Sequence, residues 1–237
     1  MKLKKIILPV VAGAMFMGCS NTMDNRETIR SVTTQEEQQA LTASDVQFQL
    51  TEGNERFVRG ELTNRDYQEQ VKLSEGAQYP KSVILSCIDS RVPVETIFDL
   101  GIGDAFVARV AGNISNEDIL GSLEFATEVS GAKLVVVLGH ESCGAVKSAE
   151  ADVKLGNITP LLSKIKPAVE NIREKENLKD LPNLELVNEI SRENVVLTIE
   201  NLREESPILN SLEEEGKIKI VGGIYEVDSG RVRWLDL

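Results

Sequence analysis

The sequence predicts one α/β domain with a mostly parallel central sheet flanked by helices, preceded by an N-terminal helical arm. Three observations lead to this prediction. Short apolar runs rich in branched residues alternate with segments of helical periodicity, which is typical of strand–helix–strand units. The chain has 237 residues, enough for one domain with a sizeable core. Its hydrophobic content of 41% is ordinary for a globular protein.

The helical arm is expected at the start of this domain. From residue 44 to residue 59 the apolar residues recur near helical spacing, and Gly60 follows as a stop signal. A second, shorter helix is expected over residues 64–73. The domain itself is therefore predicted to cover residues 44–237.

The strands are predicted from short apolar runs. Such runs are bounded by turn residues and are typical of strands buried on both faces. A turn at 228–230 is expected to lead into a last strand at 231–235 that extends the sheet as a hairpin. The other predicted strands cover residues 81–88, 105–110, 133–138 and 217–227.

Helices are expected between these strands. One should cover residues 115–130, where Ser115 and Asp118 resemble a capping box. Another should begin near Gly144, and 157–215 should be mostly helical, with breaks at Pro182 and Pro207.

The position of the strands predicts where a ligand would bind. In parallel sheets the crevice lies beyond the carboxyl ends of the strands. Cys87 falls at the end of the first predicted strand and His140 just past the end of the third. If these strands are neighbours, both side chains meet in one crevice.

The stretch HESCGA holds the only histidine of the chain, His140, and Cys143 follows three residues later. Together with Cys87 they form a set of thiol and imidazole donors, which zinc prefers. Three protein ligands with one open position is the catalytic pattern. A fourth protein ligand would have to supply oxygen, and Asp89 is the candidate.

Asp89 lies in CIDSR, two residues from Arg91. On an extended chain, residues two apart share a face. Arg91 would keep the carboxylate ionised and orient it by paired hydrogen bonds. A carboxylate beside a metal-bound water can accept its proton or hold its hydrogen.

Four segments resemble the β-class carbonic anhydrases: CIDSRV (87–92), HESCGA (140–145), ARVAGN (108–113) and GNERF (53–57). The resemblance covers residues 44–237. It implies reversible hydration of carbon dioxide to bicarbonate and a proton by a zinc-bound hydroxide, with one zinc ion per subunit. It also implies a homodimer or an assembly of dimers, with the first helices packed on the partner.

The same resemblance implies the roles of individual residues. Asp89 and Arg91 form the catalytic dyad, with Asp89 as a possible fourth ligand in a closed state. The metal ligands are Cys87, His140 and Cys143. The walls of the substrate pocket are expected to include Val92, Gly144, Ala111, Gly112 and Asn113.

Some members of that family have a second, inhibitory bicarbonate site built from tryptophan, arginine and tyrosine. Arg109 and Tyr225 match the last two positions, but Ile84 stands where the tryptophan would fall. The only tryptophan is Trp234, so this site is not expected in that form.

Several simpler interpretations stay open on the sequence alone. Cys87 and Cys143 would form a disulfide in an oxidising compartment. His140 would be a core histidine, and Asp89 with Arg91 a surface ion pair. Two further classes are a zinc-binding lipoprotein without catalysis and a Cys–His hydrolase with Cys87 or Cys143 as nucleophile. Metal content separates a zinc protein from the hydrolase and the disulfide.

The N-terminus predicts export and lipidation. A basic start is followed by an apolar run of signal-peptide length over residues 6–17. Gly18 precedes Cys19, as in bacterial lipoprotein signals, so residues 1–18 are expected to be a signal peptide and Cys19 the lipidated residue. Residues 19–43 are polar and predicted to be a flexible tether. The expected location is the bacterial periplasm or cell envelope, anchored to a membrane.

The charge excludes one class of partner. The formal net charge is -12 at pH 7, so the chain has no basic surface to neutralise phosphates. No nucleic acid is therefore expected to bind.

Overall fold

The computed structural model describes residues 27–175, 178 and 181–237. At its centre lies a 5-stranded sheet in the order β2-β1-β3-β4-β5. Neighbouring strands run parallel except β5, which is antiparallel to β4 and forms the predicted hairpin. The predicted mostly parallel sheet is confirmed. The strands span β1 Ser82–Ser86, β2 Ala105–Arg109, β3 Leu134–His140, β4 Lys219–Tyr225 and β5 Val232–Trp234.

Strand β3 illustrates why the strands have continuous apolar sequences. From Leu134 to Leu138 every side chain is 0% exposed. Successive side chains point to opposite faces, so Val135 and Val137 belong to one apolar layer and Val136 to the other. A sheet covered by helices on both faces needs apolar residues at every position rather than at alternate ones.

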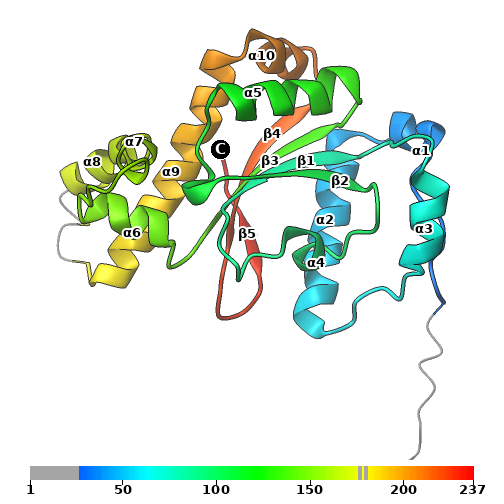
Figure 1. The fold of residues 1–237 in the computed structure, drawn as a ribbon, viewed down its shortest axis with the longest axis horizontal. Coiled ribbons are helices and arrows are strands. Elements are labelled where there is room, and N and C mark those ends of the chain that lie inside the picture. The colour runs from blue at the N-terminus through cyan, green and yellow to red at the C-terminus, as the bar shows by residue number, and fades with distance from the viewer. Residues whose placement is uncertain (1–26, 176–177, 179–180) are drawn as a thin grey trace, which may run out of the picture.

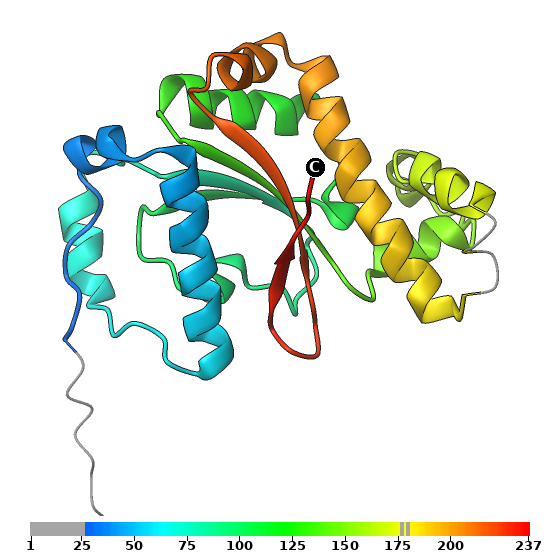
Figure 2. The ribbon, with the colours of Figure 1, turned by 180° about the vertical axis from the view of Figure 1, so that it is seen from behind.

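Two layers of helices cover the sheet. Figures 1 and 2 show α5, α9 and α10 on one face and α2 with α4 on the other. Each layer shares its own apolar cluster with the sheet. The helices span α2 Ala43–Arg59, α4 Val94–Ile97, α5 Glu117–Glu124, α9 Asn183–Glu205 and α10 Pro207–Glu214.

A third apolar cluster lies where the carboxyl ends of β1 and β3 meet α6 to α9. It includes Cys87 and Cys143 together with Val146 of α6, Ile165 before α8 and Ile190 of α9. In Figure 1 these helices gather at the end of the molecule opposite α1 and α3. The remaining helices of this group span α6 Gly144–Glu150, α7 Ile158–Leu162 and α8 Lys166–Glu174.

The capping box predicted at Ser115 and Asp118 is wrong by one residue. Asn116 is the N-cap of α5, and its side chain accepts a hydrogen bond from the Ile119 amide at 2.9 Å. Ser115 is instead buried, 7% exposed, in the extended segment before the helix. Both residue types cap helices well, so local sequence alone does not choose between them. After α5 the chain continues as a π-helix, Phe125–Val129.

The segment predicted as a flexible tether is folded from residue 27 on. Helix α1, Gln35–Ala40, begins with a capping box formed by Thr34 and Glu37. Gln38 is 5% exposed, and its Nε2 donates to the carbonyls of Pro80 at 2.7 Å and Ser130 at 2.8 Å. These contacts are distant in sequence, which is why composition alone missed them.

The N-terminal arm packs on its own sheet in this chain. Val46 and Leu50 of α2 are 1% and 2% exposed and belong to the same apolar layer as Ile84 and Val136. The second arm helix is α3, Tyr67–Ser74, which begins three residues later than predicted because Asp66 caps it. The arm is therefore part of this subunit's own core.

Asp99 ties the arm to the end of α4. Its carboxylate accepts hydrogen bonds from Arg56 Nε at 2.6 Å and Thr63 Oγ1 at 2.6 Å, and it also pairs with Arg65. The Asp99 side chain is 2% exposed. Burial alone raises the pKa of this carboxyl, but hydrogen bonds from Thr63, Arg56 and Arg65 outweigh burial and hold the pKa below 3.8.

The predicted signal peptide and Cys19 lie outside the described residues. Within the residues that the structure describes, no helix has the length and apolar character needed to cross a bilayer.

Candidate metal centre

The carboxyl ends of two neighbouring strands bring the predicted ligands together. Cys87 directly follows β1, and His140 is the last residue of β3 rather than lying just past it. The two strands pair in parallel, with Ser86 opposite Leu138. Cys143 immediately precedes α6 and is its N-cap. The two side chains therefore meet at the strand ends, as the strand order predicted.

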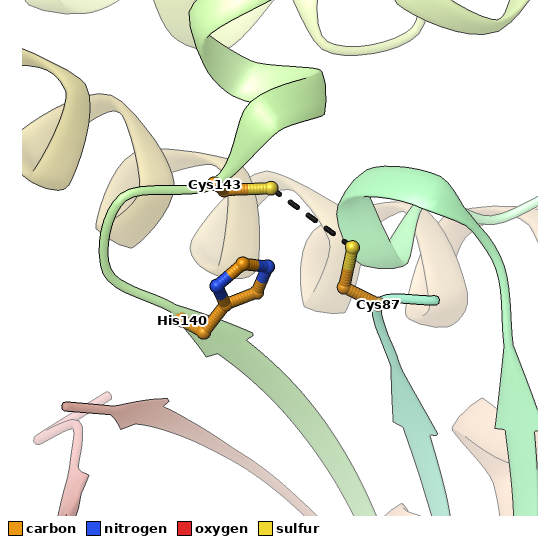
Figure 3. A group of neighbouring side chains, drawn as sticks. All are labelled: Cys87, His140 and Cys143. Atoms are coloured by element: carbon orange, nitrogen blue, oxygen red, sulfur yellow. Dashed lines mark hydrogen bonds between the residues drawn. The ribbon is translucent and has the colours of Figure 1, made fainter. Parts of the chain in front are cut away.

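The three ligand atoms form a compact, buried cluster. They all lie within 4.8 Å of one another. The exposed fractions are 4% for Cys87, 1% for His140 and 1% for Cys143. Figure 3 shows the imidazole pointing from the end of β3 toward the gap between the two sulfur atoms. The cluster can therefore bind one metal ion at its centre.

The orientation of His140 favours metal binding through Nε2. Its Nδ1 lies 2.9 Å from the Glu141 carbonyl, which fixes Nδ1 as the protonated nitrogen and leaves the lone pair on Nε2. Nε2 is buried and has no hydrogen-bond partner among the described residues. A buried polar atom without a partner is costly, and a metal ion supplies the missing interaction. The interpretation as a satisfied core histidine does not account for this atom.

The sulfur spacing fits a tetrahedral metal and not a disulfide. The Cys87 and Cys143 sulfur atoms are 4.0 Å apart, and both thiols are free. A disulfide requires about 2.05 Å. Two thiolates bound to one zinc at about 2.3 Å each are separated by roughly 3.8 Å. The donor set and its spacing therefore fit zinc.

The two thiols influence each other's ionisation. A hydrogen bond from Cys143 is the main cause that lowers the pKa of the Cys87 thiol to about 4, and the Gly112 amide contributes in the same direction. The same contact with Cys87, together with burial, raises the pKa of Cys143. The opposite directions follow from the proximity of the two sulfur atoms, because two thiolates so close would repel each other.

Asp89 and Arg91 form a two-pronged ion pair beside the cluster. Arg91 Nε donates to Asp89 Oδ1 at 3.0 Å, and Arg91 Nη2 donates to Oδ2 at 2.9 Å. These hydrogen bonds lower the pKa of Asp89 to about 2. Asp89 Oδ2 also lies 3.9 Å from His140 Nε2, so the pair faces the metal position. A plain surface ion pair does not explain that placement.

The predicted pocket walls occupy different positions around the cluster. Ala111, Gly112 and Asn113 form one 3-10 turn, and the Gly112 amide donates to Cys87 Sγ at 3.3 Å. Gly144 is the first residue of α6, directly after Cys143. Val92 is 0% exposed in the apolar layer under α2 and α4. The Val92 amide donates to the Asp89 carbonyl at 3.0 Å, so Val92 holds the backbone of the Asp89–Arg91 segment rather than lining a pocket.

Sequence reasoning missed how Arg109 holds the Cys87–Asp89 segment. Arg109 Nε donates to the Cys87 carbonyl at 2.9 Å, and Nη2 donates to the Asp89 carbonyl at 2.7 Å. Arg109 ends β2 and lies opposite Ser86 in the register. The register of β1 against β2 would have placed Arg109 beside the Cys87–Asp89 segment. The pattern of apolar residues, however, does not indicate that an arginine side chain donates to backbone carbonyls.

Comparison with known proteins agrees with this site. Residues 82–232 match the carbonic anhydrase family. Carbonic anhydrase 2 of Mycobacterium tuberculosis is 38% identical over 184 residues, which cover 77% of this chain and 87% of that protein. The β-carbonic anhydrase CafA of Aspergillus fumigatus is 31% identical with a TM-score of 0.66, over 72% of this chain and 82% of that one.

A third similar structure is a tetrameric β-carbonic anhydrase of Sordaria macrospora, 26% identical with a TM-score of 0.63. It covers 68% of this chain and 83% of that one. The fold and the Cys–His–Cys cluster together define an α/β protein with a candidate metal site at the strand ends. The chain belongs to the β-class carbonic anhydrase family.

Proposed function

We propose that this chain catalyses the reversible hydration of carbon dioxide to bicarbonate and a proton, with one zinc ion per subunit. The observation that carries the proposal is the Cys87, His140 and Cys143 cluster with the Asp89–Arg91 pair facing it. Either feature alone occurs in unrelated proteins, whereas their juxtaposition at the ends of β1 and β3 places a metal site beside an ionised carboxylate, a combination suited to this reaction.

Zinc fits the donor set because thiolate and imidazole are its preferred ligands. Three protein ligands leave one position of a tetrahedral ion free. When bound, zinc lowers the pKa of a water molecule to about 7 and so supplies a nucleophile near neutral pH. The chain contributes the remaining chemistry through its own side chains.

Asp89 is placed to orient the reacting water. Both of its oxygens are held by Arg91, which lowers the pKa of Asp89 to about 2 and so keeps the carboxylate ionised near neutral pH. An ionised carboxylate accepts a hydrogen bond and therefore turns the water's lone pair toward the incoming carbon dioxide. While Asp89 pairs with Arg91 in this way, it would leave the fourth position of a bound zinc ion open to water. We therefore propose the open form of the site.

The surroundings of the cluster suit a small apolar substrate. Ile114, Val146 and Ile165 are buried in the apolar cluster that contains both ligand cysteines. An apolar wall excludes bulk water and strengthens the electrostatic interactions inside the site. The only histidine is a ligand, so buffer or acidic side chains must carry the released proton.

We propose that the active unit is a dimer or an assembly of dimers. Strand β2 is an edge of the sheet, and an unpaired edge is a site for pairing with another chain. Phe125 and Val129, on the π-helix after α5, are 52% and 69% exposed. A cavity of about 530 Å³ lies between this region and β2, lined by Val83, Phe106 and Phe125 among others. A second copy of the chain is the occupant that we propose.

We also propose that the protein is exported and anchored by lipid at Cys19, in the periplasm or cell envelope. The basic start, the apolar run and Gly18 before Cys19 support this proposal. Cys19→Ser should move the protein from the membrane fraction to the soluble fraction. Unchanged membrane association of that variant would contradict lipid anchoring.

The test of the proposed reaction compares Asp89→Asn with the unmodified chain. Asparagine keeps the shape of the side chain but cannot hold the charge or pair with Arg91. We expect Asp89→Asn to keep zinc but to lose activity by about 100-fold or more, the range typical of a group that handles a proton in the transition state. Carbon dioxide hydration and zinc per chain are measured on the same samples. Unchanged turnover of this variant would refute the role of Asp89.

A further inference from the structure

Helix α9 sends two amide side chains to the loops that carry the metal ligands. The helix packs against the same apolar cluster that contains Cys87 and Cys143, through Val187 and Ile190. Asn188 and Asn194 project from this helix to backbone atoms of two separate loops. Neither loop is close to α9 in sequence.

Asn194 fixes the turn that contacts Cys87. It is 2% exposed, and its Nδ2 donates to the Gly112 carbonyl at 2.8 Å. The Gly112 amide in turn donates to Cys87 Sγ at 3.3 Å. Gly112 has φ 72°, and a Cβ there would lie 2.5 Å from Ile165 Cδ1, so this close approach of the turn to Ile165 requires glycine. A continuous path of contacts therefore leads from α9 to a metal ligand.

Asn188 fixes the loop between the other two ligands. Its Oδ1 accepts a hydrogen bond from the Ser142 amide at 2.9 Å. Ser142 has φ 55°, a left-handed conformation that a non-glycine residue adopts only when its surroundings stabilise it. The Ser142 carbonyl accepts a hydrogen bond from Arg91 Nη2 at 3.3 Å. Asn188 thus supports the backbone on which both Cys143 and the dyad depend.

Helix formation alone does not explain why asparagine side chains stand at positions 188 and 194. Asparagine is a poor residue for a helix interior, because its side chain competes for backbone hydrogen bonds. Ser191, between them, shows the ordinary alternative: its hydroxyl donates to the Val187 carbonyl of its own helix at 2.9 Å. Asn188 and Asn194 instead contact other segments, so their hydrogen bonds serve the loops.

We propose that Asn188 and Asn194 are positioning residues for the metal centre, holding the ligand loops in the geometry that binds zinc. This inference rests on the proposed zinc site. The two residues act with opposite hydrogen-bond roles, since Asn194 donates and Asn188 accepts. If the two side chains only filled space, one substitution would have similar effects on zinc release at both positions. Opposite hydrogen-bond roles instead predict that the same substitution has different effects.

The test is the same substitution, asparagine to aspartate, at both positions of the full-length chain. Asn188→Asp keeps the acceptor oxygen, so zinc release to a chelator should stay within about 3-fold of the unmodified protein, whereas Asn188→Leu should release zinc about 10-fold to 100-fold faster. Asn194→Asp loses the donor and should release zinc faster by about 10-fold to 100-fold. Asn194→Ala, which introduces no charge, provides a second variant and should behave like Asn194→Asp.

Ser191→Ala is the matched control, because it removes a buried hydroxyl of the same helix whose hydrogen bond goes to the Val187 carbonyl of that helix and not to a ligand loop. Its zinc release should equal that of the unmodified protein. A spectroscopic measurement accompanies the kinetics: with cobalt in place of zinc, loss of the Asn194 amide should shift the sulfur-to-cobalt charge-transfer band, and Ser191→Ala should not shift it.

Two results would overturn the inference. One is equal zinc release from Asn194→Ala and Ser191→Ala. The other is equally fast release from Asn188→Asp and Asn188→Leu. If the unmodified chain itself binds no zinc, the proposed function fails instead, and the two failures are thereby distinguished.

Discussion

Replacing Gly112 by alanine should destabilise the fold through two effects that can be separated. The left-handed backbone, φ 72°, costs a residue with a Cβ about 1–2 kcal/mol. The new Cβ would also lie 2.5 Å from Ile165 Cδ1, and overpacking of this kind costs about 1–3 kcal/mol. We therefore expect a loss of about 2–5 kcal/mol in the free energy of unfolding, a large part of the roughly 5–15 kcal/mol of a typical domain.

Two glycine-to-alanine variants serve as controls for the separate effects. Gly60 has φ 69° and nothing within 4 Å of an added Cβ, so Gly60→Ala should show the backbone cost alone, about 1–2 kcal/mol. Gly121 lies within α5 and also has nothing within 4 Å, so Gly121→Ala should stabilise the protein by about 0.5–1 kcal/mol.

Urea unfolding followed by tryptophan fluorescence measures all three variants. Trp234 is the only tryptophan, and it stacks on Phe98 with ring centroids 6.1 Å apart, so its emission reports the packed state. If Gly112→Ala costs no more than Gly60→Ala, the contact with Ile165 is relieved without penalty, and the argument that this close approach requires glycine is refuted.

Four further predictions rest on the same structure. Asp99→Asn should lower the free energy of unfolding by up to about 3–5 kcal/mol, because it leaves Arg65 without its buried partner. Urea unfolding measures this change, and a decrease of less than about 0.5 kcal/mol would contradict the prediction. Because the pKa of Asp99 lies below 3.8, its stabilisation should be fully present above that pH and be lost as the pH falls further. Cys143→Ala should abolish zinc binding, measured by elemental analysis, and a normal zinc content would exclude Cys143 as a ligand. Phe125→Glu should shift the protein toward the monomer, as measured by light scattering. Leu155→Glu is the control, at a side chain near α6 that is 62% exposed, and it should not change the oligomer. If neither variant changes the oligomer, the interface lies elsewhere.

The sequence was sufficient to predict the parts of the fold that depend on local patterns. The strands could be predicted because parallel strands buried on both faces need unbroken apolar runs, as β3 shows. The Cys–His–Cys cluster could be predicted because cysteine and histidine are scarce in this chain, with three and one respectively, so few combinations exist.

The missed features depend on contacts between distant segments. Residues 27–43 look polar and featureless, but Gln38 satisfies the carbonyls of Pro80 and Ser130, which only the folded chain brings near. Asn188 and Asn194 were missed for the same reason. A side chain that binds a backbone atom of another segment leaves no spacing signature, since any backbone amide or carbonyl can be its partner.

Carbon dioxide hydration by the full-length chain, followed from about pH 6.5 to about pH 9 with zinc quantified on the same sample, tests the central claim most directly. The open site predicts about one zinc per chain and robust activity throughout this range, because Asp89 stays paired with Arg91. Activity confined to the alkaline end would show that Asp89 occupies the fourth metal position. One zinc with no activity at any pH would contradict the account and indicate a zinc-binding protein without catalysis.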